Sequence, residues 1–119
     1  MRILVIEDTE DNRTILRDLF HSAGHEVIEA VNGEDGVAAA GREHPDLILM
    51  DIQLPIIDGY EATRRIKSMP DLHLIPIIAV TSHALADDEE KARAAGCDDY
   101  VAKPFSPRQL LAKVQRYAR

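Results

Sequence analysis

Four short apolar segments of the chain are each followed by a side chain that can handle a phosphoryl group. The segments are residues 3–6, 47–50, 77–80 and 100–102, and the side chains that follow them are Glu7 with Asp8, Asp51, Thr81 and Lys103. If the segments are parallel strands, these side chains emerge at the carboxyl edge of one sheet, where open α/β sheets bind ligands. The pattern therefore predicts one pocket that holds three carboxylates, a hydroxyl and an ammonium group.

The three carboxylates predict a metal site. At one sheet edge they repel one another, so at least one pKa rises unless a cation binds. Oxygen ligands with room for waters and a phosphate fit Mg²⁺ better than Zn²⁺ or a Ca²⁺ cage. We expect Asp8 and Asp51 to bind the ion directly, Glu7 to act through a water, and the backbone carbonyl of Gln53 to be a further ligand. With the ion bound, Asp51 can attack phosphorus as a carboxylate nucleophile.

Thr81 and Lys103 fit the same chemistry, because phosphoryl transfer depends mainly on charge stabilisation around the transferred oxygens. Taken singly, each residue has a simpler interpretation. A threonine at a strand end is usually a turn residue, a lysine before proline is usually exposed, and an aspartate after a strand often caps a helix. The joint placement of these residues at four strand ends favours the functional interpretation.

The residues between the strands predict helices. Apolar residues spaced by three and four from Ile15 to Ala23 predict the first helix, with Thr9 as its N-cap and Gly24 at its end. A second strand is expected at 26–30, and the other helices at about 34–43, 58–68, 87–95 and 106–117. Strict alternation requires right-handed crossovers and a parallel sheet covered on both faces. We therefore expect a flavodoxin-like, doubly wound (βα)5 sandwich with strand order 2-1-3-4-5.

The last two helices differ in how firmly they are held. The fourth helix has no Leu, Ile or Val between Glu89 and Ala95, so we expect it to be weakly packed and able to move. The fifth begins with Ser106, Pro107 and Gln109, the pattern of a capping box with proline at the first helical position.

Length and composition narrow the class of protein. With 119 residues and 45% hydrophobic content, the chain suits one domain spanning residues 1–119. No apolar stretch approaches the roughly 20 residues of a membrane span, and no signal peptide is evident, so a cytoplasmic location is expected. A formal net charge of −7 disfavours direct binding of nucleic acid. The single cysteine, Cys97, cannot form an internal disulfide.

Five motifs together resemble the receiver domain of two-component response regulators, over residues 2–117. They are the acidic pair at 7–8, residues 50–55 with the Asp-Gly at 58–59, and residues 80–82, 96–100 and 103–105. The resemblance implies that Asp51 is phosphorylated from a phosphohistidine of a sensor histidine kinase or histidine phosphotransfer protein. It implies Mg²⁺ bound through the acidic pair, and a cis peptide bond before Pro104.

The resemblance also implies a switch. Thr81 would turn toward the phosphoryl group and Tyr100 would turn inward, which changes the face formed by the fourth helix, fifth strand and fifth helix. A downstream protein would bind that face. Gln53 and His83, each two residues beyond a site residue, would tune phosphorylation and hydrolysis. We hypothesise that His83 orients the attacking water.

Three other interpretations were weighed. The first is a phosphatase that resembles the haloacid dehalogenase superfamily, which carries an acid two residues after the nucleophile. Gln53 stands at that position here. We therefore expect that the chain is not an enzyme and that it catalyses only its own phosphorylation and dephosphorylation. A pseudo-receiver that never takes phosphate is the second. A receiver excised from a hybrid kinase is the third, although Met1 directly before the first strand favours a stand-alone regulator of the chemotaxis or cell-cycle type.

Overall fold

The structure, a computed structural model, describes residues 1–81 and 87–118. Within those ranges, five strands alternate strictly with five helices, as the sequence predicted. The elements are β1 (Arg2–Ile6), α1 (Glu10–Ser22), β2 (Glu26–Ala30), α2 (Gly33–Glu43), β3 (Leu47–Asp51), α3 (Gly59–Lys67), β4 (Ile77–Thr81), α4 (Asp88–Ala95), β5 (Asp99–Ala102) and α5 (Pro107–Gln115).

All neighbouring strands of the sheet are parallel, and their order is β2-β1-β3-β4-β5. The predicted flavodoxin-like order is therefore confirmed. The chain reverses its direction of winding between β1 and β3, so the carboxyl ends of these two strands lie next to each other. In the register of the sheet, Ile6 pairs with Met50, and Asp51 pairs with Val80. The fold thereby brings the residues after β1 and at the end of β3 to one point.

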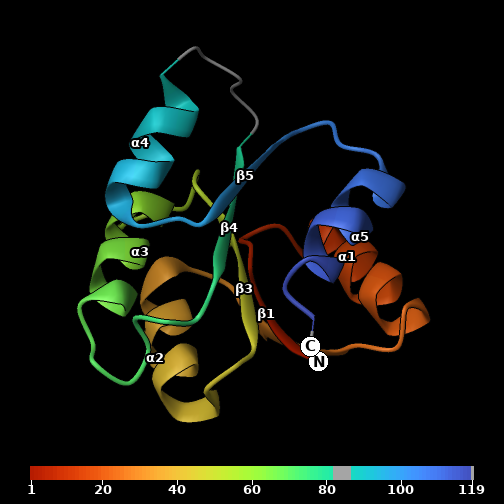
Figure 1. The fold of residues 1–119 in the computed structure, drawn as a ribbon, viewed down its shortest axis with the longest axis horizontal. Helices are drawn as coiled ribbons and strands as arrows, with labels where there is room; N and C mark the ends of the chain where they lie inside the picture. Colours follow the sequence, from red (N-terminus) through yellow and green to blue (C-terminus); the bar gives the residue numbers. More distant parts are fainter. Residues whose placement is uncertain (82–86, 119) are drawn as a thin grey trace.

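Helices cover both faces of the sheet (Figure 1). Helices α1 and α5 lie on one face, and α2, α3 and α4 lie on the other. Successive strand side chains point to opposite faces, which produces two apolar cores. The α1/α5 core contains Val5, Leu49 and Phe20, and the opposite core contains Ile6, Met50 and similar residues. Every residue of β3 is buried, which explains why this strand is apolar until it reaches Asp51.

The helix ends follow the predicted signals with one exception. The Ser106 hydroxyl accepts a hydrogen bond from the N–H of Gln109 at 3.0 Å and so caps α5. Thr9 occupies the N-cap position of α1, but its side chain makes no capping hydrogen bond. Its N–H instead donates to Glu7 Oε2 at 3.0 Å. Because the Glu7 carboxylate turns back over the start of α1, the expected threonine cap was wrong in its chemistry though right in its position.

Ile15 is a second difference from the expected pattern. Its helical spacing predicted an inward position, yet 61% of the residue is exposed. The reason is a cavity between α1 and the β5–α5 connection, which Ile15 lines together with Leu16 and Phe105. The apolar stripe of α1 is therefore wider than the surface that α5 and the sheet cover.

Helices α4 and α5 are anchored by different means. The buried residues of α4 are Asp88, Ala92 and Ala95, so this helix buries little apolar side-chain surface, in line with the sequence. Helix α5 buries larger side chains, and its Lys113 also binds β5 through Asp99, with 3.0 Å between Nζ and Oδ1. No helix in the described part of the chain is long and apolar enough to cross a membrane.

Gly59, the first residue of α3, provides a test of how closely this helix must approach β3. A Cβ atom there would lie 2.5 Å from the backbone oxygen of Asp51 and 2.6 Å from Cα of Ile52. Backbone atoms cannot yield cheaply, so Gly59→Ala is expected to lower the free energy of unfolding by about 2 kcal/mol in urea denaturation. Gly41→Ala is the matched control, because its Cβ meets nothing within 4 Å and alanine favours a helix by about 0.5 kcal/mol or more. Equal stability of the two variants would contradict the close packing.

Asp99 provides a test of the link between β5 and α5. Its carboxylate accepts hydrogen bonds from the N–H of Tyr100 and from Lys113. Burial alone would raise its pKa, but Lys113 and that N–H outweigh burial and hold the pKa of Asp99 below its ordinary value of 3.8. A carboxyl whose pKa is lower in the folded protein stabilises the fold above its ordinary pKa and loses this contribution as pH falls through the folded value.

Asp99→Asn is therefore expected to lower the free energy of unfolding by about 2 kcal/mol at pH 7. The difference from wild type should shrink as the pH falls below 3.8. Urea denaturation at several pH values measures both. Glu26→Gln, which removes an exposed partner of Arg2, is the control and should change stability by less than about 0.5 kcal/mol. A difference for Asp99→Asn that does not depend on pH would show that its carboxylate charge is not what holds α5.

Candidate functional site

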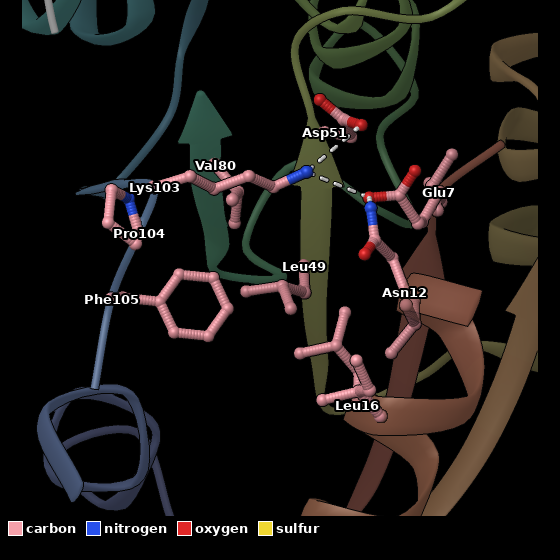
Figure 2. A pocket seen from close by; sticks show the side chains of 12 residues that line it. Glu7, Asn12, Leu16, Leu49, Asp51, Val80, Lys103, Pro104 and Phe105 are labelled. Carbon is pink, nitrogen blue, oxygen red and sulfur yellow. Dashed lines mark hydrogen bonds and ion pairs between the residues drawn. The ribbon is translucent and has the colours of Figure 1, made fainter. Parts of the chain in front are cut away.

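The predicted site residues meet at the carboxyl edge of the sheet (Figure 2). Glu7 follows β1, Asp51 ends β3, and Lys103 follows β5, and their side chains point toward one another. One oxygen each of Glu7, Asp8 and Asp51 lies within 4.8 Å of the others. Glu7 and Asp51 are buried, at 2% and 5% exposure, whereas Asp8 is exposed to solvent. A group of hard oxygen donors with one open side fits a divalent cation that retains waters and accepts a phosphate oxygen.

Lys103 is the cation that the protein itself brings to this cluster. Its Nζ lies 3.0 Å from Glu7 Oε1 and 3.7 Å from Asp51 Oδ2. A backbone hydrogen bond holds the residue beside the end of β4. The peptide bond between Lys103 and Pro104 is cis, and the N–H of Lys103 donates to the carbonyl of Thr81 at 2.7 Å. The ammonium group therefore bridges the two buried carboxylates, with the shorter contact to Glu7.

The carboxylates differ in how readily they ionise. Burial raises the pKa of Asp51 to about 6, and the nearby Glu7 charge acts in the same direction. Partial burial and then Glu7 also raise the pKa of Asp8. Burial would raise the pKa of Glu7 as well, but the N–H of Thr9 and Lys103 outweigh it and hold that pKa below its ordinary value. Glu7 is thus the carboxylate that the protein itself neutralises, and Asp51 is the one left needing a cation.

The ammonium of Lys103 stays charged in this setting. Burial lowers its pKa, but the hydrogen bond to Glu7 and the charge of Asp51 outweigh burial and raise it. An ammonium held between carboxylates is suited to bind the oxygens of a transferred phosphoryl group, whose charge it complements. The same site thus places the Asp51 carboxylate, a group that can act as a nucleophile, beside a positive charge.

The other predicted residues lie around this cluster. The N–H of Gln53 donates to Asp51 Oδ1 at 2.9 Å, which orients the carboxylate. Thr81 is buried at the end of β4, in register with Ala102 of β5. Tyr100 is half-buried and packs against the core under α2, α3 and α4, away from the carboxylates. His83 lies outside the described residues.

Asn12 is a site residue that the sequence analysis missed. Its Nδ2 donates to Glu7 Oε1 at 3.2 Å, so it joins the cluster directly. The signal that could have revealed it is its position in the first turn of α1, because helical side chains lean toward the N-terminus. From the sequence alone, Asn12 is accounted for as part of the helix start, because a polar residue in a first helical turn usually faces solvent.

An apolar cavity of about 430 Å³ adjoins the cluster and was also not predicted. Its walls come from β1, α1, β3 and the β5–α5 connection, and Figure 2 shows Leu16, Leu49 and Phe105 below the charged groups. Apolar walls lower the polarity of the surroundings on one side of the site, which strengthens the electrostatic interactions there. The site therefore has one polar opening and one apolar wall.

Comparison with known proteins shows the family to which this fold and site belong. A protein-family profile for the response regulator receiver domain matches residues 3–115. The chain is 41% identical over 115 residues to the polar-differentiation response regulator DivK of Brucella ovis, covering 97% of this chain and 94% of DivK.

Solved structures of receiver domains superpose closely on this one. The receiver domain of a sensor histidine kinase from Pseudomonas aeruginosa, with a magnesium ion coordinated in its active-site cleft, is 40% identical with a TM-score of 0.90, covering 98% of this chain and 95% of that one. The chemotaxis response regulator CheY4 of Vibrio cholerae is 26% identical with a TM-score of 0.92, covering 98% of each chain. The fold, the acidic cluster and these relatives together show that the chain belongs to the response regulator receiver domain family.

Proposed function

We propose that the chain is a phosphorylation-activated switch that works in the cytoplasm. Asp51 takes a phosphoryl group from a phosphohistidine of a sensor histidine kinase or histidine phosphotransfer protein. The observation that carries this proposal is the setting of Asp51, a buried carboxylate that lies beside two further acids and 3.7 Å from the ammonium of Lys103. A carboxylate in this position can act as a nucleophile, and the neighbouring ammonium can bind the oxygens of the phosphoryl group that it attacks.

In the transfer step, a carboxylate oxygen of Asp51 forms a bond to phosphorus while the bond from phosphorus to the donor imidazole nitrogen breaks. The electron pair of the broken bond returns to that nitrogen. Asp8, Asp51 and the Gln53 carbonyl would hold Mg²⁺ directly, with Glu7 reached through a water. When bound, the ion neutralises charge on the phosphoryl oxygens. Lys103 binds the phosphoryl oxygens from the other side, and the Gln53 N–H orients the attacking carboxylate.

The phosphoryl group signals by shifting the population of two packings of the output face, formed by α4, β5 and α5. Thr81 turns toward the phosphoryl group. Tyr100 then turns inward, which changes the outer face of β5. Two observations support this face: α4 buries only small apolar side chains, and a hollow of about 470 Å³ lies between β5 and α5, lined by Tyr100, Gln109 and Lys113 among others. A downstream protein binds there. Gln53 and His83 tune the lifetime of the phosphoryl group.

A second candidate is that the chain is the receiver of a hybrid kinase. The 40% identity with the receiver domain of a sensor histidine kinase favours it. The chemistry at Asp51 is the same in that case, but the donor histidine belongs to the same polypeptide or its direct relay partner. A pseudo-receiver would fail the phosphorylation test that follows.

Phosphorylation of Asp51 is tested by intact mass spectrometry after incubation with Mg²⁺ and acetyl phosphate. We expect the mass of one added phosphoryl group, lost on standing and absent without Mg²⁺, because the nucleophile needs its charge neutralised. Asp51→Asn should show no addition. Asp18→Asn, which alters an exposed aspartate of α1, is the matched control and should be phosphorylated like wild type. Addition to Asp51→Asn, or none to wild type, would refute the proposal.

Mg²⁺ binding should depend on pH because Asp51 must lose its proton to bind the ion. With a pKa of about 6 in the metal-free protein, Asp51 is largely protonated at pH 5 and ionised at pH 7.5. The apparent affinity for Mg²⁺ is therefore expected to fall about tenfold for each pH unit below 6. Isothermal titration calorimetry across this range measures it.

Asp51→Asn is the control for the pH dependence, since it should bind Mg²⁺ weakly and with a flatter dependence on pH between 5 and 7.5. Equal affinity of the wild-type protein at pH 5 and pH 7.5 would show that Asp51 is not a ligand that must deprotonate.

A further inference from the structure

The two oxygens of the Glu7 carboxylate accept different numbers of hydrogen bonds. Oε2 accepts from the N–H of Thr9 at 3.0 Å. Oε1 accepts from two side chains, Nδ2 of Asn12 at 3.2 Å and Nζ of Lys103 at 3.0 Å. Because Glu7 is only 2% exposed, bulk water has little access to these oxygens, and donors of the protein provide their hydrogen bonds in this structure.

The proposed function makes competing demands on Lys103. In the unphosphorylated protein its ammonium is closer to Glu7 than to Asp51, at 3.0 Å against 3.7 Å. A phosphoryl group on Asp51 adds charge and strong acceptor oxygens, which draw the ammonium toward Asp51. As Lys103 turns away, Glu7 Oε1 loses its charged donor. A buried carboxylate oxygen with no donor is strongly destabilising, so the turn is opposed unless another donor remains.

Asn12 is the donor that remains. Its backbone is fixed in the first turn of α1, and the side chain reaches Oε1 independently of β5. The Arg13 guanidinium, which donates to the Glu7 backbone carbonyl at 2.9 Å, holds the same turn against the end of β1. The Asn12 amide therefore stays beside Glu7 whichever carboxylate Lys103 binds.

We infer that Asn12 is a positioning residue, which keeps Glu7 hydrogen-bonded and so releases Lys103 to bind the phosphoryl group on Asp51. This inference rests on the proposed function. It assigns a role to a residue that never touches the phosphoryl group and acts through the competition between Glu7 and Asp51 for one ammonium. Without the amide, Glu7 would hold Lys103 more tightly, and phosphorylation would slow.

A double-mutant cycle between Asn12 and Glu7 tests the inference, because a coupled pair departs from additivity. Asn12→Leu removes the donor but keeps the branched shape of the side chain. The rate constant for phosphorylation by acetyl phosphate at saturating Mg²⁺ is expected to fall about tenfold, the effect of losing one hydrogen bond to a charged group. In a Glu7→Gln background the same change should have less than about a twofold effect, since the charge that competes for Lys103 is gone.

Asn32→Leu is the matched control. Asn32 is also an asparagine whose Nδ2 donates to a carboxylate, that of Asp35, and its side chain caps α2. We expect this variant to lose stability and to keep the wild-type rate of phosphorylation. Asn12→Ala is the second variant at the site, and urea denaturation shows whether either Asn12 variant has lost its fold.

A further measurement needs neither metal nor phosphate. In the metal-free protein, exchange of the Lys103 ammonium protons with water, followed by NMR, is expected to slow about threefold in Asn12→Leu, because Glu7 then holds the ammonium more tightly. A rate loss that persists unchanged in the Glu7→Gln background, or exchange that does not slow, overturns the inference while leaving the proposed function intact. A wild-type chain that takes no phosphoryl group overturns the proposed function instead, and the exchange measurement still decides whether Asn12 controls Lys103.

Discussion

Glu7 and Asp51 are buried carboxylates at the ends of neighbouring parallel strands, and the rest of the site follows from their mutual repulsion. Two buried negative charges so close cannot both be stable without a cation. The protein supplies one ammonium, from a residue 96 positions away from Glu7 in the sequence. This single charge lies closer to Glu7 than to Asp51. Burial raises the pKa of Asp51, whereas the N–H of Thr9 and Lys103 outweigh burial at Glu7 and lower its pKa. The shortage of positive charge at Asp51 favours binding of a metal cation beside it.

The elements around the site differ in how tightly they are packed: β3 and the start of α3 are packed closely, whereas α4 is packed lightly. β3 is buried along its whole length, and α3 begins so close to it that only glycine fits at position 59. Asp51 is therefore fixed by close packing, which transmits strain rather than absorbing it. By contrast, α4 buries only alanines and Asp88. In the proposed switch, the lightly packed α4 is the element that a change of charge at Asp51 would shift.

The apolar cavity next to the acidic cluster adds to this electrostatic design. Its walls, which include Leu16, Leu49 and Phe105, place apolar surface against one side of the buried charges. In a less polar environment each hydrogen bond to a carboxylate is stronger, and each missing one is more destabilising. Small differences in donor placement, such as the two donors on one oxygen of Glu7, can therefore decide where Lys103 goes.

The amino-acid sequence by itself determined the alternation of strands and helices, the sheet order and the edge at which the reactive groups gather. These features depend on apolar periodicity, capping residues and the handedness of crossovers, all of which are local or general to the fold. It erred where neighbours decide: Ile15 faces a cavity rather than the core, and the Thr9 side chain does not cap α1. Only the tertiary structure decided which donor meets which carboxylate oxygen, how Lys103 divides between Glu7 and Asp51, and that Asn12 takes part. Those outcomes turn on differences of less than an ångström between side chains from distant parts of the chain, and no spacing along the sequence encodes them.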